Sequence, residues 1–265
     1  MYQTTYHRPS TVQEAASLLA SAEDVKLLAG GQTLIPTMKQ RLAAPANLID
    51  LGRIAELKGI TVSGGTVTIG AGTTHAEVHT SADVKAAIPA LAKLAGGIGD
   101  PHVRHLGTIG GSVANNDPAA DYPSAVLGLG ATVVTTKREI PADDFFAGMF
   151  TTALEEDEII VRFVFPVPRK AAYAKFANPA SRYAMTGVFV AVTGDGVRVA
   201  VTGAGSDGVF RWMDAEAALA SDLSPSALDG LSLDPSGMLS DIHGDAAYRA
   251  NLVKVMAKRA LAALG

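Results

Sequence analysis

Two glycine-rich segments of the chain contain the residue types that bind phosphate groups. The first occupies residues 29–33 (AGGQT) and the second residues 108–112 (TIGGS), 80 residues apart when measured from Gly30 to Gly110. A glycine pair followed by a hydroxyl residue lets backbone N–H groups point into one concavity without an obstructing Cβ, which suits a diphosphate. The first segment also precedes a predicted helix, whose N-terminal dipole favours an anion. Ordinary tight turns remain the alternative explanation for both segments.

The composition excludes several other chemistries. The 265 residues include no cysteine, so the chain cannot form a disulfide, a thiolate zinc site, a cysteine nucleophile or a cysteine-ligated iron–sulfur cluster. Any redox role must therefore use an organic cofactor or a partner's metal. The formal net charge of −4 excludes a general nucleic-acid binder, because no basic face is available for phosphate backbones.

The sequence shows no export signal and no membrane-spanning segment. The N-terminal residues contain no apolar stretch of signal-peptide type, and the longest uncharged run, 122–136, contains two glycines. A membrane span needs roughly 20 apolar residues, so no transmembrane segment is expected. The sequence indicates a soluble, cytoplasmic protein.

Other known motifs fail at particular positions. Asp50 lies where a ribose-binding acid would follow a dinucleotide loop, but the required G-x-G-x-x-G is absent. His75 and His79 share one predicted helix face, yet Ala76 replaces the glutamate of the zinc-protease pattern. We interpret that face as polar surface, and the acidic run 155–158 as a solvated turn before a strand. No Gly-x-Ser-x-Gly elbow and no Walker A loop occurs.

Hydrophobic periodicity predicts the elements that position these segments. Helices are expected at 11–20, 36–42, 75–79, 89–95, 124–129, 215–220 and 248–264. Strands are expected at 25–29, 47–51, 131–135 and 158–165, with tight hairpins over 59–70 and 188–202. The stretch 221–245 is expected to be a surface connection. Pro166 and Pro168 mark the expected domain boundary.

One long segment resembles a known family. Residues 98–123 read IGDPHVRHLGTIGGSVANNDPAADYP, which closely resembles the signature of the FAD-binding medium subunit of molybdenum hydroxylases. The carbon monoxide dehydrogenase and xanthine dehydrogenase flavoproteins belong to that family. Residues 28–36 (LAGGQTLIP) resemble its first flavin loop, and 69–75 and 173–176 also match. The resemblance covers essentially the whole chain in the expected order.

The resemblance implies a fold and a division into domains. The fold would be α+β, a vanillyl-alcohol-oxidase or PCMH-type FAD-binding fold of two α/β subdomains with a small C-terminal α/β domain. The FAD-binding domain would cover residues 1–168, with subdomains at about 1–55 and 56–168. The C-terminal domain, similar to that of the carbon monoxide dehydrogenase flavoprotein, would cover 169–265.

The resemblance also implies cofactor contacts, residue by residue. The two glycine-rich segments would cradle the FAD diphosphate, and Asp121 would hydrogen-bond the cofactor near its ribityl or adenosine portion. Ile160 would pack against FAD and Lys175 would lie near the flavin, with Asn115 and Tyr122 as further candidates close to the isoalloxazine. The expected contact set is Leu28, Ala29, Gly30, Gly31, Gln32, Thr33, Leu34, Thr108, Gly110, Gly111, Ser112, Asn115, Asp121, Ile160 and Lys175. No catalytic acid or base and no metal ligand is expected on this chain.

Two positions depart from the family pattern. Gln32 and Thr33 stand where many relatives have His-Ser; either pair can donate hydrogen bonds, so FAD binding is expected to persist with different tuning. Arg182 stands where the family usually has an acidic residue. This changes the charge expected beside the flavin.

The function implied by the resemblance is that of an electron-transfer subunit. Substrate would be oxidised at a molybdopterin centre on a large partner chain, and a small partner chain would carry 2Fe–2S clusters, in a dimer of heterotrimers. Electrons would reach the FAD of this chain from the nearer cluster and leave to quinone, NAD⁺, oxygen or another acceptor. Two alternatives stay open: a self-sufficient flavoprotein oxidase or dehydrogenase, and an FAD-dependent assembly module without activity. The holoenzyme's substrate could be carbon monoxide, a purine, an aldehyde or an N-heterocycle.

Overall fold

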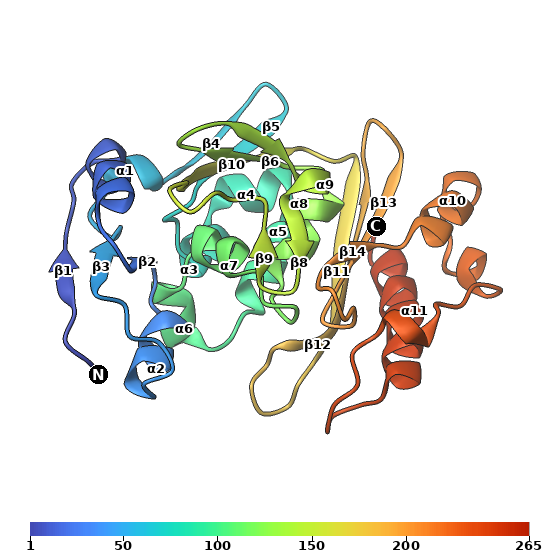
Figure 1. Ribbon diagram of the computed structural model, residues 1–265. Coiled ribbons are helices and arrows are strands. Elements are labelled where there is room, and N and C mark those ends of the chain that lie inside the picture. Colours follow the sequence, from blue (N-terminus) through green and yellow to red (C-terminus); the bar gives the residue numbers. More distant parts are fainter. Residues whose placement is uncertain (265) are drawn as a thin grey trace.

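Three larger β-sheets follow one another along the chain, a two-stranded ribbon is a fourth, and most of the helices belong to the central part (Figure 1). The computed structural model describes residues 1–264. Figure 1 shows the N-terminal sheet at one end, the central sheet and its helices in the middle, and the C-terminal sheet followed by a long helix at the other end. Within residues 1–264 no helix is long and apolar enough to cross a membrane.

The N-terminal part is a small parallel sheet with two helices. Its strands are β1 (Thr5–His7), β2 (Val25–Leu28) and β3 (Asn47–Asp50), in the order β1-β3-β2. Helix α1 (Val12–Ser21) begins where predicted, because the Thr11 side chain accepts a hydrogen bond from the N–H of Glu14. Helix α2 (Leu34–Lys39) follows the first glycine-rich loop and ends three residues earlier than expected. Since β2 is an edge strand, this loop leaves the sheet at its margin.

The central part is a five-stranded antiparallel sheet covered by short helices. The strand order is β4 (Ile60–Ser63), β5 (Thr66–Gly70), β10 (Ile160–Pro166), β6 (Thr132–Thr135) and β7 (Glu139–Pro141). Its helices are α3 (His75–Thr80), α4 (Ala82–Ala87), α5 (Pro89–Gly96), α6 (Pro101–Leu106), α7 (Ile109–Asn115), α8 (Tyr122–Gly128) and α9 (Ala142–Phe145). A small ribbon of β8 (Phe146–Gly148) and β9 (Thr151–Thr152) follows α9.

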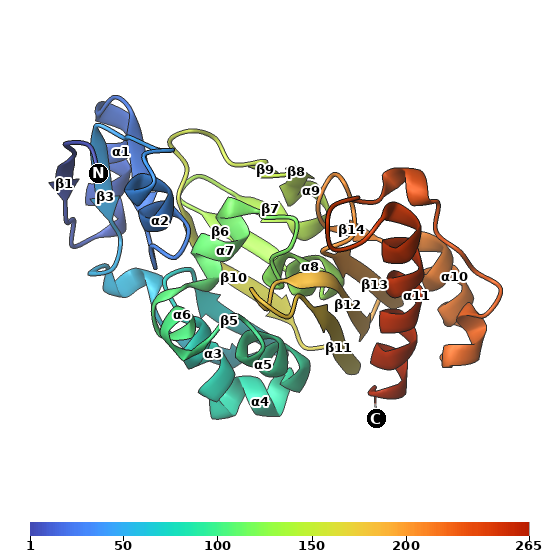
Figure 2. The ribbon, with the colours of Figure 1, turned by 90° about the horizontal axis from the view of Figure 1, so that it is seen from below.

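The C-terminal part is a four-stranded antiparallel sheet between two layers of helix (Figure 2). Its strands, in order, are β11 (Lys170–Ala177), β12 (Ala184–Val192), β13 (Val197–Thr202) and β14 (Phe210–Arg211). Helices α10 (Met213–Ser221) and α11 (Ala246–Ala262) pack on one side, and α5 and α8 contact the sheet from the central part. Tyr173 and Phe189 of this sheet are buried in the same hydrophobic core as the central helices. The central and C-terminal parts therefore share a core across residue 168.

The predicted hairpins and most predicted helices are confirmed, and the structure adds elements that were not predicted. The glycine-punctuated stretch 103–112 belongs to two helices, α6 and α7, that meet at Gly107. Asp100 caps α6 through the N–H of Val103, and Pro101 occupies its first position. Strands β1, β7, β8, β9, β11 and β14 and helices α4 and α9 were not predicted. Strand β11 reads KAAYAKFA and has low intrinsic β propensity, so pairing with β12 rather than local preference forms it.

Candidate functional site

The two glycine-rich loops, far apart in sequence, are in contact in the structure. A Cβ placed on Gly30 would lie 2.1 Å from the carbonyl oxygen of Leu106 and 2.6 Å from Cα of Gly107. A Cβ placed on Gly111 would lie 3.4 Å from Cβ of Ala29. The first loop thus rests on the turn between α6 and α7, and only glycine at position 30 permits this approach.

The first loop leaves its backbone donors open. The N–H groups of residues 30–34 donate to no acceptor anywhere in residues 1–264. Gly31 has φ +70°, a left-handed conformation that favours glycine. The loop is only partly buried, and the Gln32 side chain donates back to the carbonyl oxygen of Gly30 at 3.1 Å. Consecutive unpaired N–H groups in an accessible loop are what a diphosphate binds.

The backbone donors of the second loop, unlike those of the first, are bonded within the protein. Its first N–H groups already have protein acceptors: Ile109 donates to the carbonyl oxygen of Thr73 at 3.1 Å and Gly110 to that of Ala71 at 2.8 Å. The N–H groups of Gly111 and Ser112 donate to the hydroxyl and carbonyl oxygens of Thr108. A Cβ on Gly110 would lie 2.6 Å from both Cβ and the carbonyl oxygen of Ala71. The glycines of this loop permit close packing, and its backbone does not form an open anion cradle.

A second group of expected residues forms a buried ion pair. Lys175 Nζ donates to Asp121 Oδ2 at 2.9 Å and to the carbonyl oxygen of Gly97 at 3.2 Å, and the hydroxyl of Tyr173 donates to Asp121 Oδ1 at 2.5 Å. Asp121 is 4% exposed; burial raises its pKa, and Lys175 and Tyr173 act in the opposite direction. Both oxygens of Asp121 are therefore engaged by the protein, and its carboxylate fixes the ammonium group of Lys175.

Residues 97–107 connect the ion pair to the two loops. Gly97 accepts from Lys175, and Gly107 lies against Gly30. Between them, the carbonyl oxygen of Gly99 accepts hydrogen bonds from Arg104 at 3.2 Å and from Arg182 at 3.3 Å. Arg182, one of the departures from the family pattern, lies between β11 and β12 with φ +63°. The hairpin therefore places a guanidinium group on the segment that joins the two parts of the site.

The remaining expected contacts lie around α7 and α8. Asn115 is the last residue of α7 and is half-buried, whereas Tyr122 and Ile160 lie in the central core and Tyr122 has no exposed surface. Asn116, which sequence reasoning missed, ends α7 in a left-handed conformation and donates from its side chain to the carbonyl oxygens of Gly148 and Thr151. Asparagine at a helix C-cap is the signal that could have found it.

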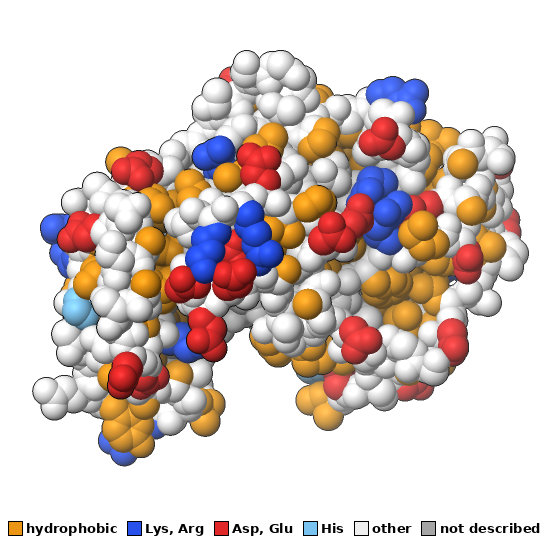
Figure 3. Space-filling model, turned by 45° about the horizontal axis from the view of Figure 1, so that its top comes forward, with side chains coloured by type: hydrophobic (Ala, Val, Ile, Leu, Met, Phe, Trp, Pro, Cys, Tyr) orange, Lys and Arg blue, Asp and Glu red, His pale blue; other side chains and the backbone are white. Residues whose placement is uncertain are grey.

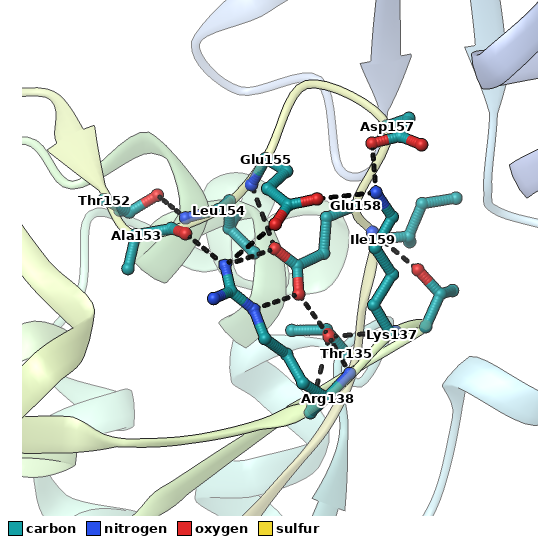
Figure 4. Close-up of polar contacts among 11 residues, drawn as sticks. Thr135, Lys137, Arg138, Thr152, Ala153, Leu154, Glu155, Asp157, Glu158 and Ile159 are labelled. Atoms are coloured by element: carbon teal, nitrogen blue, oxygen red, sulfur yellow. Dashed lines mark hydrogen bonds and ion pairs between the residues drawn. The ribbon is translucent and has the colours of Figure 1, made fainter.

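The acidic run before β10 is not a simple solvated turn (Figure 4). Glu158 is buried and accepts hydrogen bonds from Arg138, the hydroxyl of Thr135 and the N–H of Glu155. Burial alone would raise the pKa of Glu158, but these bonds outweigh it and lower the pKa to about 2. Lys137 forms ion pairs with Glu155 and Asp157 at the surface. The cluster fixes the turn from which β10 begins, and with it the position of Ile160.

The face of α3 was also interpreted incorrectly. His75 is 5% exposed and packs against Gly107, whereas His79 bonds the carbonyl oxygen of Ala92 through Nδ1 at 2.9 Å. The capping box between Thr74 and Glu77 turns the first residue of α3 inward. In the described part of the chain, no group of three or more His, Asp or Glu side chains could hold a metal ion.

Basic and acidic side chains are interspersed on the face shown in Figure 3.

Comparisons with known proteins agree on one family. Residues 2–168 match a family model described as the FAD binding domain in molybdopterin dehydrogenase. The chain is 36% identical to the carbon monoxide dehydrogenase medium chain of Hydrogenophaga pseudoflava, covering 97% of this chain and 95% of the relative. It is 37% identical to the nicotine 6-hydroxylase medium subunit of Paenarthrobacter nicotinovorans, covering 98% and 96%.

A solved structure supports the same conclusion. The fold matches a chain of a carbon monoxide dehydrogenase from Hydrogenophaga pseudoflava that lacks the Mo-pyranopterin moiety, with TM-score 0.90, 37% identity and coverage of 99% of this chain and 97% of that chain. The expected α+β FAD-binding fold is confirmed by this match.

Proposed function

This chain belongs to the family of FAD-binding subunits of the molybdopterin dehydrogenases, and we propose that it works as the electron-transfer subunit of a heteromeric molybdenum hydroxylase. It is an oxidoreductase subunit with FAD as its cofactor. Its electrons would come from 2Fe–2S clusters on a small partner chain and pass to a terminal acceptor. A large partner chain would bind molybdopterin and oxidise the substrate. The assembly we propose is a dimer of heterotrimers.

One observation carries the proposal for this chain: the open amide groups of residues 30–34 lie on the turn that starts α7. These donors fit the FAD diphosphate, because they are unpaired and partly exposed. FAD supplies the electron-transfer chemistry when it is bound. The chain's own residues bind and orient it: the first loop holds the diphosphate, while Leu106, Gly107 and Gly111 provide the surface against which the first loop packs.

Lys175 is the residue we propose to interact with the flavin. Its ammonium group is held by Asp121 and Gly97, and the Lys175 side chain is 11% exposed. A fixed positive charge beside a reduced flavin stabilises negative charge there. Substitution Lys175→Met should therefore lower the flavin reduction potential, measured by anaerobic titration against a reference dye. An unchanged potential, with FAD still bound, would remove this role from Lys175. Lys85→Met is the control, because it removes an exposed lysine charge from α4 and leaves the ion pair of Lys175 with Asp121 intact.

The function is tested by anaerobic spectroscopy of the chain purified from its host with its co-eluting subunits. We expect a flavin spectrum together with a large molybdopterin-containing chain and a small cysteine-rich chain. FAD on a lone chain that bleaches directly with an organic substrate would instead favour a self-sufficient oxidase. A folded chain that takes up no added FAD would refute the proposal.

A further inference from the structure

His75 lies directly beneath the point where the two glycine-rich loops meet. It is the first residue of α3, and its N–H donates to the carbonyl oxygen of Gly107 at 3.0 Å. A Cβ placed on Gly107 would lie 2.6 Å from His75 Nε2, and the same Gly107 meets Gly30 of the first loop. Gly107 is therefore held between the imidazole ring and the first loop.

The strand-like segment before α3 binds the same turn. Ala71 and Thr73 accept from the N–H groups of Gly110 and Ile109, and Thr74 forms an isolated β-bridge with Thr108. These bonds fix the second loop to the central sheet. None of them reaches the first loop, whose amide groups are open. The His75 side chain, which follows this segment in the chain, contacts Gly107, and Gly107 contacts Gly30 of the first loop.

The surroundings of His75 keep its ring uncharged. The side chain is 5% exposed, and burial together with the nearby Arg104 lowers its pKa to about 4. Its ring centroid lies 5.3 Å from that of Tyr122. Neither Nδ1 of His75 nor the hydroxyl of Tyr122 has a hydrogen-bond partner among the residues described. Unpaired buried polar atoms are costly and rare, so packing alone is a weak reason for histidine at this position.

We propose that His75 is a positioning residue of the FAD site: its uncharged imidazole holds Gly107 against Gly30 and so keeps the open amide groups of the first loop in place for the diphosphate. This inference rests on the proposed FAD site. His75 acts through Gly107, and no contact between the imidazole and the cofactor is required.

The test compares His75→Ala with Val78→Ala in the full chain. Val78 lies on the same helix and is completely buried in the central core, but its aliphatic side chain has no polar atom. Each variant is stripped of FAD, its thermal midpoint is measured, and its Kd for added FAD is determined from flavin fluorescence. We expect His75→Ala to raise the Kd by about tenfold or more, and Val78→Ala to change it by less than about threefold at a similar loss of thermal stability.

A spectroscopic measurement separates positioning from loss of stability. The ³¹P NMR signals of the bound diphosphate should shift in His75→Ala and stay unchanged in Val78→Ala. His75→Gln, which keeps a polar side chain of similar length, should recover part of the affinity. Equal effects of His75→Ala and Val78→Ala on Kd and on the ³¹P signals would overturn the inference. Wild-type protein that binds no FAD would instead refute the proposed function itself.

Discussion

The two glycine-rich loops have similar residue patterns but differ in what their backbone N–H groups bind. In the first loop the donors of residues 30–34 are open, while in the second loop the donors of residues 109–112 are bonded to Ala71, Thr73 and Thr108. Gly110 is needed because Ala71 lies where its Cβ would be, and Gly31 is needed because its φ is +70°. A glycine pair can therefore indicate either a ligand cradle or a packing contact, and the hydrogen-bond partners decide which.

The largest expected effect is loss of stability in the second loop. Gly110→Ala places a methyl group 2.6 Å from both backbone and side chain of Ala71, so the sheet and α7 must separate. We expect a loss of about 3 kcal/mol in the free energy of unfolding. Urea unfolding of the FAD-free protein measures it.

Gly111→Ala is the control for that experiment. Its new Cβ would meet Thr108 Oγ1 at 3.1 Å and Ala29 at 3.4 Å, and small shifts relieve both contacts. We expect a cost of less than about 1 kcal/mol. Similar losses for the two variants would mean that close packing on Ala71 does not distinguish Gly110 from its neighbour.

Local patterns in the sequence predicted the glycine loops, the tight hairpins β4–β5 and β12–β13 and the capped helix α1, because each depends on residues close in the chain. The hydrogen bonding of the second loop was not predictable in this way, since its acceptors Ala71 and Thr73 come from a distant segment. Glu158 was misread for the same reason: its partner Arg138 is 20 residues away. Strand β11 was missed because its alanine-rich sequence carries no strand signal.

The free energy of unfolding should depend on pH through His75, the side chain that packs against Gly107. The pKa of His75 is about 4 in the folded chain and 6.5 in its ordinary state, so the unfolded chain binds more protons between these values. Stability should therefore fall as the pH decreases from 6.5 to 4 and then level off, by about 3 kcal/mol in total. Urea unfolding across this range, in wild type and in His75→Phe, measures the contribution as a difference.

The difference in pH dependence between wild type and His75→Phe can be assigned to His75, because the groups around it are the same in both proteins. Arg104 of α6 and Tyr122 of α8 surround the ring, and Glu77 and His79 share its helix. All of them, and Glu158 with its displaced pKa, are present in both proteins and their contributions cancel. Parallel pH profiles for wild type and His75→Phe would show that the imidazole is accessible to protons in the folded chain.

The first loop should respond mainly in cofactor affinity. Gly31→Ala forces a side chain into a left-handed conformation, which costs about 1–2 kcal/mol if the backbone keeps its shape. Relaxation would move the neighbouring amide groups, so we expect FAD to bind about tenfold more weakly. Gly65→Ala is the control for the left-handed conformation alone: Gly65 has φ +77° in the β4–β5 turn with no atom within 4 Å of a Cβ, whereas a Cβ on Gly31 would also meet Ile35 at 3.0 Å. If Gly65→Ala weakened FAD binding equally, the effect of Gly31→Ala would be general destabilisation.

The smallest expected effects come from two threonines that hold equivalent places at the start of α2 and α7. Thr108 caps α7 through the N–H of Gly111, whereas Thr33 makes no capping bond with its side chain. Thr108→Ala should therefore cost about 1 kcal/mol of stability and leave FAD affinity nearly unchanged. Thr33→Ala should leave the thermal midpoint unchanged and weaken FAD binding, because its hydroxyl stands beside open amide groups and is available to the cofactor. The reverse result would assign the ligand to the second loop, since a side chain that only caps a helix cannot change the affinity of a cofactor bound elsewhere.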